Sequence, residues 1–253
     1  MMKNLLSLTA LTVLGASAAN AIEWDVMAGG GVLVAPRYMG SKNIKATPLP
    51  ALSITGKVSE QTEISLNGPE AAVTHRLENS GFSIGAKAAI DFGRDNDEDI
   101  MVRGLKDVDA GLEVGPTVSY ALTPALTLNT EITQEVAGGH GGLKGRAGVS
   151  HVSMLPYRTT LVTSAGLNAA NKKAQNTYFG VPANATRADR PAYTAEGGLS
   201  HADVSVMALS PLKGSWVLQS LVGADILLAD AADSPLSKQN IAPKAMVNLL
   251  YRF

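Results

Sequence analysis

The chain ends in Met246-Val-Asn-Leu-Leu-Tyr-Arg-Phe253, and this stretch decides the fold class. Its odd-numbered residues are all apolar and finish in two aromatic rings, whereas Asn248 and Arg252 stand at even positions. A period of two predicts a β-strand with two different faces. Such a final strand is typical of outer-membrane β-barrels, in which the last strand closes the barrel against lipid. The alternative is the final core strand of a soluble β-sandwich.

The other end of the chain favours the barrel. Lys3 supplies a positive charge, Leu5–Ala16 is an apolar segment, and Ala19-Asn20-Ala21 is a small-x-small cleavage sequence. These features identify a secretory signal peptide, which is too short to span a membrane. We expect residues 1–21 to be removed and residues 22–253 to form one outer-membrane barrel.

Composition excludes several classes of protein. Lys and Arg (21) nearly balance Asp and Glu (22), so a net charge of −1 provides no basic field for nucleic acid. The absence of cysteine rules out disulfides. Mean hydropathy is only +0.10, as expected when lipid-facing apolar residues alternate with polar lumen residues.

Alternation recurs along the chain in segments long enough for tilted membrane strands. The clearest runs from Phe82 to Phe92, with one wholly apolar face and with Lys87 and Asp91 on the other. We therefore predict an all-β, antiparallel up-and-down transmembrane barrel of twelve strands, or of ten if residues 60–77 are one irregular segment. The predicted strands are 22–35, 47–57, 60–67, 70–77, 81–93, 107–121, 125–136, 142–153, 156–169, 192–207, 213–229 and 243–253.

The connections and the aromatic residues support this count. Short links, as expected of periplasmic turns, alternate with longer and more polar ones, as expected of extracellular loops. Several aromatic residues fall beside the short turns and the chain ends, where an interfacial belt would place them. They are Trp24, Phe82, Tyr120, Tyr157, Trp216, Tyr251 and Phe253.

Charged residues fall on the strand faces opposite the apolar ones, which predicts a lumen of mixed sign. Asp107 and Asp109 lie two apart in a predicted strand, so they point the same way. They could pair with basic residues of the lumen, or act as an acid/base pair. The predicted network comprises Lys87, Asp91, Asp107, Asp109, Glu113, Glu131, Lys144 and Arg146.

No metal, cofactor or catalytic site is predicted. Asp95-x-Asp97-x-Asp99 opens like a calcium loop, but Ile100 replaces the required glycine and Lys106 the final bidentate glutamate. We interpret this segment as an acidic, solvated loop.

The histidines also lack ligand spacing. His140 lies within Gly138–Gly142, which predicts a mobile hairpin tip. The chain contains no G-x-S-x-G sequence, although a serine–histidine pair could still meet in space.

The longest predicted loop, residues 170–191, contains an apolar patch of Tyr178, Phe179, Gly180 and Val181. Loops of this length in compact folds are usually functional or disordered. The patch could fold onto the lumen or rim as a plug, or it could contact a ligand or partner.

Short motifs in a fixed order identify a family resemblance. Pro36-Arg37-Tyr38-Met39-Gly40-Ser41 follows the first strand, with Pro36, Tyr38, Gly40 and Ser41 as its motif positions. Pro48-Leu49-Pro50 comes next, and Asn176-Thr-Tyr-Phe-Gly-Val181 stands in the longest loop. In their order and spacing over the mature chain, these motifs resemble the MipA/OmpV family of outer-membrane proteins.

The resemblance implies a non-enzymatic outer-membrane barrel in contact with lipid and lipopolysaccharide. For the best-known member it implies a scaffold that bridges a lytic transglycosylase and a bifunctional murein synthase. Other members are porin-like proteins related to osmotic or antibiotic response. A passive channel for small solutes is therefore the alternative, and an outer-membrane hydrolase is a third, less favoured one. Barrel-assembly machinery is a further expected partner, for which Leu249, Tyr251 and Phe253 form the C-terminal signal.

Overall fold

The computed structural model describes residues 22–97 and 99–253, so the expected signal peptide lies outside the described residues. Twelve antiparallel strands close into one barrel, which confirms the predicted fold class and strand number. The strands are β1 (Glu23–Pro36), β2 (Ile44–Lys57), β3 (Thr62–Asn67), β4 (Glu70–Arg76), β5 (Phe82–Asp91), β6 (Gly111–Ala121), β7 (Leu126–Ala137), β8 (Leu143–Leu155), β9 (Thr159–Ala170), β10 (Gly198–Pro211), β11 (Trp216–Leu227) and β12 (Ile241–Arg252).

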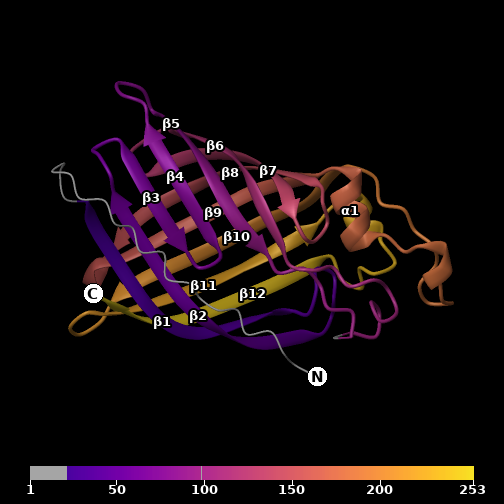
Figure 1. Cartoon of the computed structure of the whole chain (residues 1–253). Helices are drawn as coiled ribbons and strands as arrows, with labels where there is room; N and C mark the ends of the chain where they lie inside the picture. Colours follow the sequence, from indigo (N-terminus) through magenta and orange to yellow (C-terminus); the bar gives the residue numbers. More distant parts are fainter. Residues whose placement is uncertain (1–21, 98) are drawn as a thin grey trace.

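Each strand pairs with its neighbours in the sequence, and β12 returns to β1 to close the barrel (Figure 1). The closing register sets Val32 opposite Val247. Gly29 and Gly31 make this contact possible, because a Cβ on either would collide with the backbone of β12. The C-terminal strand thus closes the barrel, as its alternating pattern predicts.

The period of two separates the two surfaces of the barrel wall. On β5, Ile84 and Ile90 are exposed on the outer surface, whereas Lys87 and Asp91 point into the lumen and form ion pairs there. On β12, Leu249 faces outward while Leu250 is buried inside. The apolar cluster of Met27, Val217 and Leu250 therefore lies within the lumen, and the outer surface is apolar.

The two ends of the barrel differ. Both described chain ends and the short turns lie at one end, which we call the turn end, whereas α1 (Lys172–Phe179) lies at the other (Figure 1). Long loops at that second end pack together with α2 (Ala229–Asp233) and the 3₁₀ turn η2 (Ala183–Ala185). We call this layer the cap. A further 3₁₀ turn, η1 (Pro156–Arg158), belongs to the turn end.

Two strands begin four or more residues later than predicted, for local reasons. β6 begins at Gly111 rather than at residue 107, because Gly93 adopts φ +71° and ends β5, after which only Arg94 and Val108 pair as an isolated bridge. β10 begins at Gly198 rather than at residue 192, because Tyr193 pairs with Val181 inside the cap.

Aromatic side chains of the turn end face outward. All seven predicted belt residues are exposed. Trp216 and Tyr251 meet edge-on with ring centroids 5.2 Å apart, and Tyr251 packs against Phe253 in the same way. Such rings suit a membrane–water interface, because each has an apolar body and a polar or polarisable edge.

Among the described residues, no helix combines the length and apolarity that a bilayer crossing demands.

Candidate functional site

The most concentrated polar site lies where the lumen meets the cap. Lys144, the second residue of β8, places its ammonium Nζ 2.6 Å from Asp91 Oδ2 on β5 and 2.7 Å from Glu113 Oε1 on β6. One cation therefore joins two carboxylates that belong to different strands. All three side chains point inward because their positions have the lumen-facing parity of their strands.

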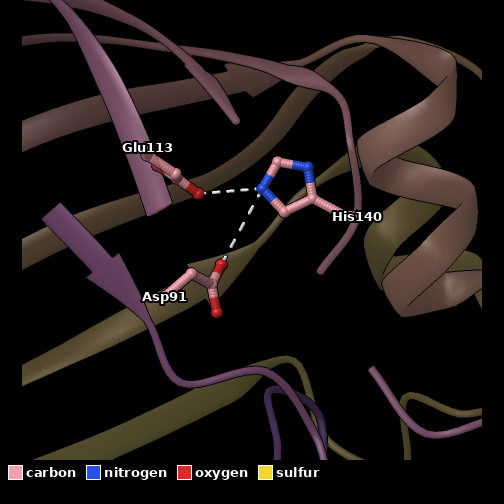
Figure 2. A group of neighbouring side chains, drawn as sticks. All are labelled: Asp91, Glu113 and His140. Atoms are coloured by element: carbon pink, nitrogen blue, oxygen red, sulfur yellow. Dashed lines mark hydrogen bonds and ion pairs between the residues drawn. The ribbon is translucent and has the colours of Figure 1, made fainter. Parts of the chain in front are cut away.

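His140 completes this site from the β7–β8 hairpin. Its Nε2 points toward both carboxylates (Figure 2) and lies 2.8 Å from Glu113 Oε1 and 3.9 Å from Asp91 Oδ2. The backbone N–H of Gly142 donates to Nδ1 at 2.9 Å, so Nδ1 is unprotonated and Nε2–H donates to Glu113. His140 is 2% exposed, so the prediction of a mobile hairpin tip was wrong. The glycines around it allow the tight turn that returns its ring to the lumen.

Asp91, Glu113 and His140 could in principle hold a metal ion, since their ligand atoms all lie within 4.8 Å of one another. The surrounding donors favour a different chemistry. Lys144 already donates to both carboxylates, and Nε2 carries the proton that a metal would have to displace. The site is a donor–acceptor network centred on an ammonium group, as expected for buried carboxylates that are paired.

Tyr178, from α1, connects the cap to this network. Its hydroxyl donates to Asp91 Oδ1 at 2.8 Å, and its ring packs against His140 and beneath the Lys144 ammonium. Burial, together with the charge of Asp91, holds the pKa of Tyr178 well above its usual value, so the phenol remains a donor. Arg94 donates from Nη1 to the Tyr178 carbonyl and fixes the end of the helix.

The remaining residues of the predicted loop patch hold the cap together. Phe179 packs with Ala195 and Leu227, and Val181 packs in a second cluster with Leu236. Gly180 ends α1, and a Cβ there would collide with Asn176. Tyr178–Val181 thus fold onto the barrel mouth, and contact of this patch with a ligand or partner stays a prediction.

The motif after β1 anchors the opposite side of the cap. Pro36 is the last residue of β1, and the Tyr38 hydroxyl donates to the Leu236 carbonyl at 2.9 Å. Gly40 adopts φ +99° and packs directly against Ser237, so a larger residue would be both strained and crowded.

Ser41 links this motif to the β5–β6 loop. Its hydroxyl donates to Asp99 Oδ2 at 2.9 Å, and Asn43 Nδ2 donates to the same oxygen at 2.8 Å. Burial opposes the charge on Asp99, yet hydrogen bonds from the Met101 N–H, Asn43 and Ser41 hold its pKa below the usual value. The interpretation of this segment as solvated was therefore wrong at Asp99, which is buried in the cap.

Two further charge clusters lie deeper in the lumen. Lys87 lies 2.8 Å from Glu70 and 2.9 Å from Glu131, so it joins β4, β5 and β7. Arg146 donates from Nε and Nη2 to the two oxygens of Asp203 at 2.9 and 2.8 Å. The predicted residues Lys87, Glu131 and Arg146 thus contact acidic or basic partners, as the lumen position of their strand faces requires.

Asp107 and Asp109 do not belong to these clusters. They precede β6, and Asp107 Oδ1 accepts from the backbone N–H of Asn96 within the cap. The prediction of a lumen carboxylate pair on one strand was wrong, because the strand needed to align their side chains starts only at Gly111.

Sequence reasoning missed further members of the lumen network, among them Glu70, His140, Asp203 and the ion pair of Asp225 with Lys244, whose Oδ1 and Nζ lie 2.7 Å apart. Asp203 on β10 and Asp225 on β11 occupy positions whose side chains face the lumen. Alternation of inward and outward positions along these strands could therefore have identified them from the sequence. His140 had no such signal, because its hairpin must fold back before its ring can reach Glu113.

These contacts join the cap and the lumen wall into one polar unit. Each oxygen of Asp91 and Glu113 accepts at least one hydrogen bond, including that from Thr133 to Glu113 Oε2. Carboxylates paired in this way stabilise the contact between the cap and the lumen wall.

Comparison with known proteins gives a family match. A family model described as MltA-interacting protein MipA matches residues 28–253 of this chain. The translocator domain of autotransporter NalP from Neisseria meningitidis is similar in structure, with 14% identity, a TM-score of 0.44 and coverage of 92% of this chain and 90% of that one. OmpF of Salmonella typhi, in complex with daunomycin, shows 8% identity, a TM-score of 0.42 and coverage of 92% and 97%. No curated protein matches the chain.

Proposed function

The chain belongs to the MipA family, and from this premise we propose that it is a non-enzymatic outer-membrane barrel with a closed lumen. We propose further that it acts as a scaffold for cell-wall enzymes at the periplasmic face. Cleavage after Ala21 would release residues 22–253 as the mature barrel.

One observation carries the closed lumen. The Lys144 network lies under α1, and Tyr178 ties it to the cap through Asp91. An ion entering from the cap side would have to separate an ammonium from two carboxylates, which costs free energy in this half-buried site. Deeper in the lumen, the bidentate pair of Arg146 and Asp203 presents a second obstacle.

Single-channel recording of the refolded protein in a planar bilayer tests this proposal. The wild-type barrel is expected to insert, show the heat-modifiable gel shift of a closed barrel, and remain electrically silent. A variant without residues 172–196, which removes α1, should conduct more than the wild type, because the cap no longer covers the mouth. Stable wild-type conductance would instead support the porin-like alternative.

The scaffold role rests on the family description, which names an interaction with MltA. The surface available for it is the turn end, where the short turns and both described chain ends lie. We expect a lytic transglycosylase of the MltA type to be retained by the immobilised barrel, with a bifunctional murein synthase as second partner.

Changes at the exposed turn residues Glu60 and Lys213 to the opposite charge should weaken this retention, whereas deletion of the cap should not. Equal binding by all variants would argue against the turn end as the docking surface.

A further inference from the structure

The lumen contains a cavity of about 210 Å³ at the turn end of the barrel. Two arginines, Arg158 and Arg252, belong to its lining, which includes no acidic side chain of the described residues. The other lining residues are apolar except for one threonine: Met27, Met154, Thr160, Leu209, Pro211 and Val217. The cavity therefore combines an apolar wall with a positive rim.

This cavity is accessible from the turn end. Met154 lies on the lumen side of β8, as Lys144 and Arg146 do, and yet it is 68% exposed. Met27, by contrast, is 8% exposed at the inner side of the cavity. Met154 is eight residues beyond Arg146, which corresponds to about 26 Å along the strand. A group entering from the turn end would thus reach the apolar wall before it met the ion pairs of the lumen.

Arg158 gives the rim a cation without a counter-charge. Its side chain is exposed and forms no ion pair or hydrogen bond with any other residue that the structure describes. Arg252 differs, because its Nε lies 3.0 Å from Asp25 Oδ1. A guanidinium group can donate two parallel hydrogen bonds to one carboxylate. Arg158 is therefore the part of the rim that is suited to bind an anionic group.

The backbone holds Arg158 in a conformation that a side chain disfavours. Tyr157 and Arg158 are the central residues of a turn in which the Thr159 N–H donates to the Pro156 carbonyl. Both have positive φ, 61° and 59° respectively. Asn-Gly is the usual sequence of such a turn, because few other residues adopt positive φ readily. Strained residues of this kind are concentrated at functional sites, and here the strained turn places an arginine beside the cavity.

We propose that this cavity binds the C-terminal residue of a periplasmic polypeptide, with an apolar side chain inside and the terminal carboxylate on Arg158. An engineered cavity of ~150 Å³ in another protein holds benzene, so the volume suits one large side chain. Two of the lining residues are methionines, whose flexible side chains adapt to different apolar shapes. The site deepens the proposed scaffold role, and it rests on the turn end facing the periplasm.

A chain end fits this cavity better than other carboxylates do. Only a C-terminal residue has an apolar side chain and a carboxylate on the same Cα, whereas internal aspartate and glutamate have the carboxylate alone. A long acyl chain would extend beyond the cavity. A sugar phosphate would place unpaired hydroxyl groups against the apolar wall, which costs free energy.

Fluorescence anisotropy measures this binding with the full barrel in lipid nanodiscs. The probe is a fluorescein-labelled hexapeptide of glycine and serine that ends in phenylalanine with a free carboxylate. We expect saturable binding, and we expect Arg158→Gln to weaken it about five- to tenfold, as loss of a partly exposed charged hydrogen bond predicts. Arg76→Gln is the matched control, because Arg76 is an exposed arginine at the turn end of β4 outside the lining. This control should bind almost as the wild type does.

The same peptide with a C-terminal amide tests the role of the carboxylate. It should bind the wild type about as weakly as the free acid binds Arg158→Gln, and Arg158→Gln should change its affinity little. Added salt should weaken binding of the acid more than binding of the amide.

Two further variants separate binding from folding. Thr160→Phe should fill the cavity and prevent binding of the peptide that ends in phenylalanine. Arg158→Gly removes the charge but also relieves the positive φ, so it should unfold at no lower urea concentration than the wild type while it loses binding as Arg158→Gln does. The heat-modifiable gel shift verifies that each variant is folded.

Absence of saturable binding would overturn the site, and equal binding of acid and amide would overturn the role of Arg158. Equal binding of peptides that end in phenylalanine and in glycine would overturn the role of the apolar wall. Competition by free 3-phenylpropionate with the affinity of the peptide would overturn the assignment to a chain end. These measurements use no transglycosylase, so retention of that enzyme by the immobilised barrel remains a separate test of the scaffold role.

Discussion

The two ends of the lumen are lined by opposite kinds of chemistry. Toward the cap, Lys144, Asp91 and Glu113 form a charged network in which each group depends on the others. Toward the turn end, Met27, Val217 and Leu250 pack as an apolar cluster. An apolar cluster loses only the contacts of the side chain removed, whereas a charged network also leaves its remaining members unpaired. We therefore expect the apolar cluster to tolerate substitution better than the charged network does.

The sharpest test of this contrast removes the cation. Lys144→Met leaves the Asp91 and Glu113 carboxylates without their shared partner, so we expect a loss of about 3–5 kcal/mol in the free energy of unfolding. Urea unfolding of the refolded barrel in lipid vesicles measures this loss. Lys172→Met is the matched control, because the exposed pair of Lys172 and Glu196 should contribute less than about 1 kcal/mol. Equal effects would contradict the importance of burial at Lys144.

A cavity-forming change tests the apolar cluster. Leu250→Ala should cost about 3 kcal/mol, since Leu250 is 2% exposed and its neighbours can collapse only partly. Leu249→Ala, one residue earlier, removes the same atoms from the outward face of β12 and should cost clearly less. Combining Leu250→Ala with Lys144→Met should give an additive loss, because the two sites share no partner. A large coupling energy in this double-mutant cycle would show that the apolar cluster and the charged network are not independent.

The smallest expected effect concerns the link between cap and network. Tyr178→Phe removes the hydrogen bond to Asp91 but retains the ring, so we expect a loss of about 2 kcal/mol at neutral pH. Because folding raises the pKa of Tyr178, its contribution is fully present below pH 10 and declines as the pH rises above this unfolded-state value. The wild type should therefore lose stability above pH 10 more steeply than Tyr178→Phe.

Unfolding free energies of both proteins between pH 8 and about pH 11 provide this comparison. Tyr38 and Tyr193 also have raised pKa values from burial, and they titrate in both proteins, so only the difference between the two curves reports on Tyr178. Parallel curves would contradict the coupling of Tyr178 to the charged network.

The fold could be predicted from the sequence to a large extent. The number of strands could be predicted from the alternating faces of strands such as β5 and β12 and from the short turns between them. Both signals arise from residues that are close together in the sequence. The predicted start of β6 was wrong because a loop, rather than a strand, precedes Gly111. Gly93 and the bridge of Arg94 with Val108 delay β6, which removes Asp107 and Asp109 from the lumen.

The sequence by itself determined that this chain forms a barrel with a mixed-charge interior, since a period of two places side chains on opposite faces of a strand whatever its partners are. Only the tertiary structure decided which charges meet. Lys144 reaches Asp91, 53 positions away, because closure of the barrel brings the ends of β5 and β8 together. Tertiary structure also decides that His140 is buried and that Tyr178 packs against it. The side chains of a loop are buried only where the loop packs against another part of the fold.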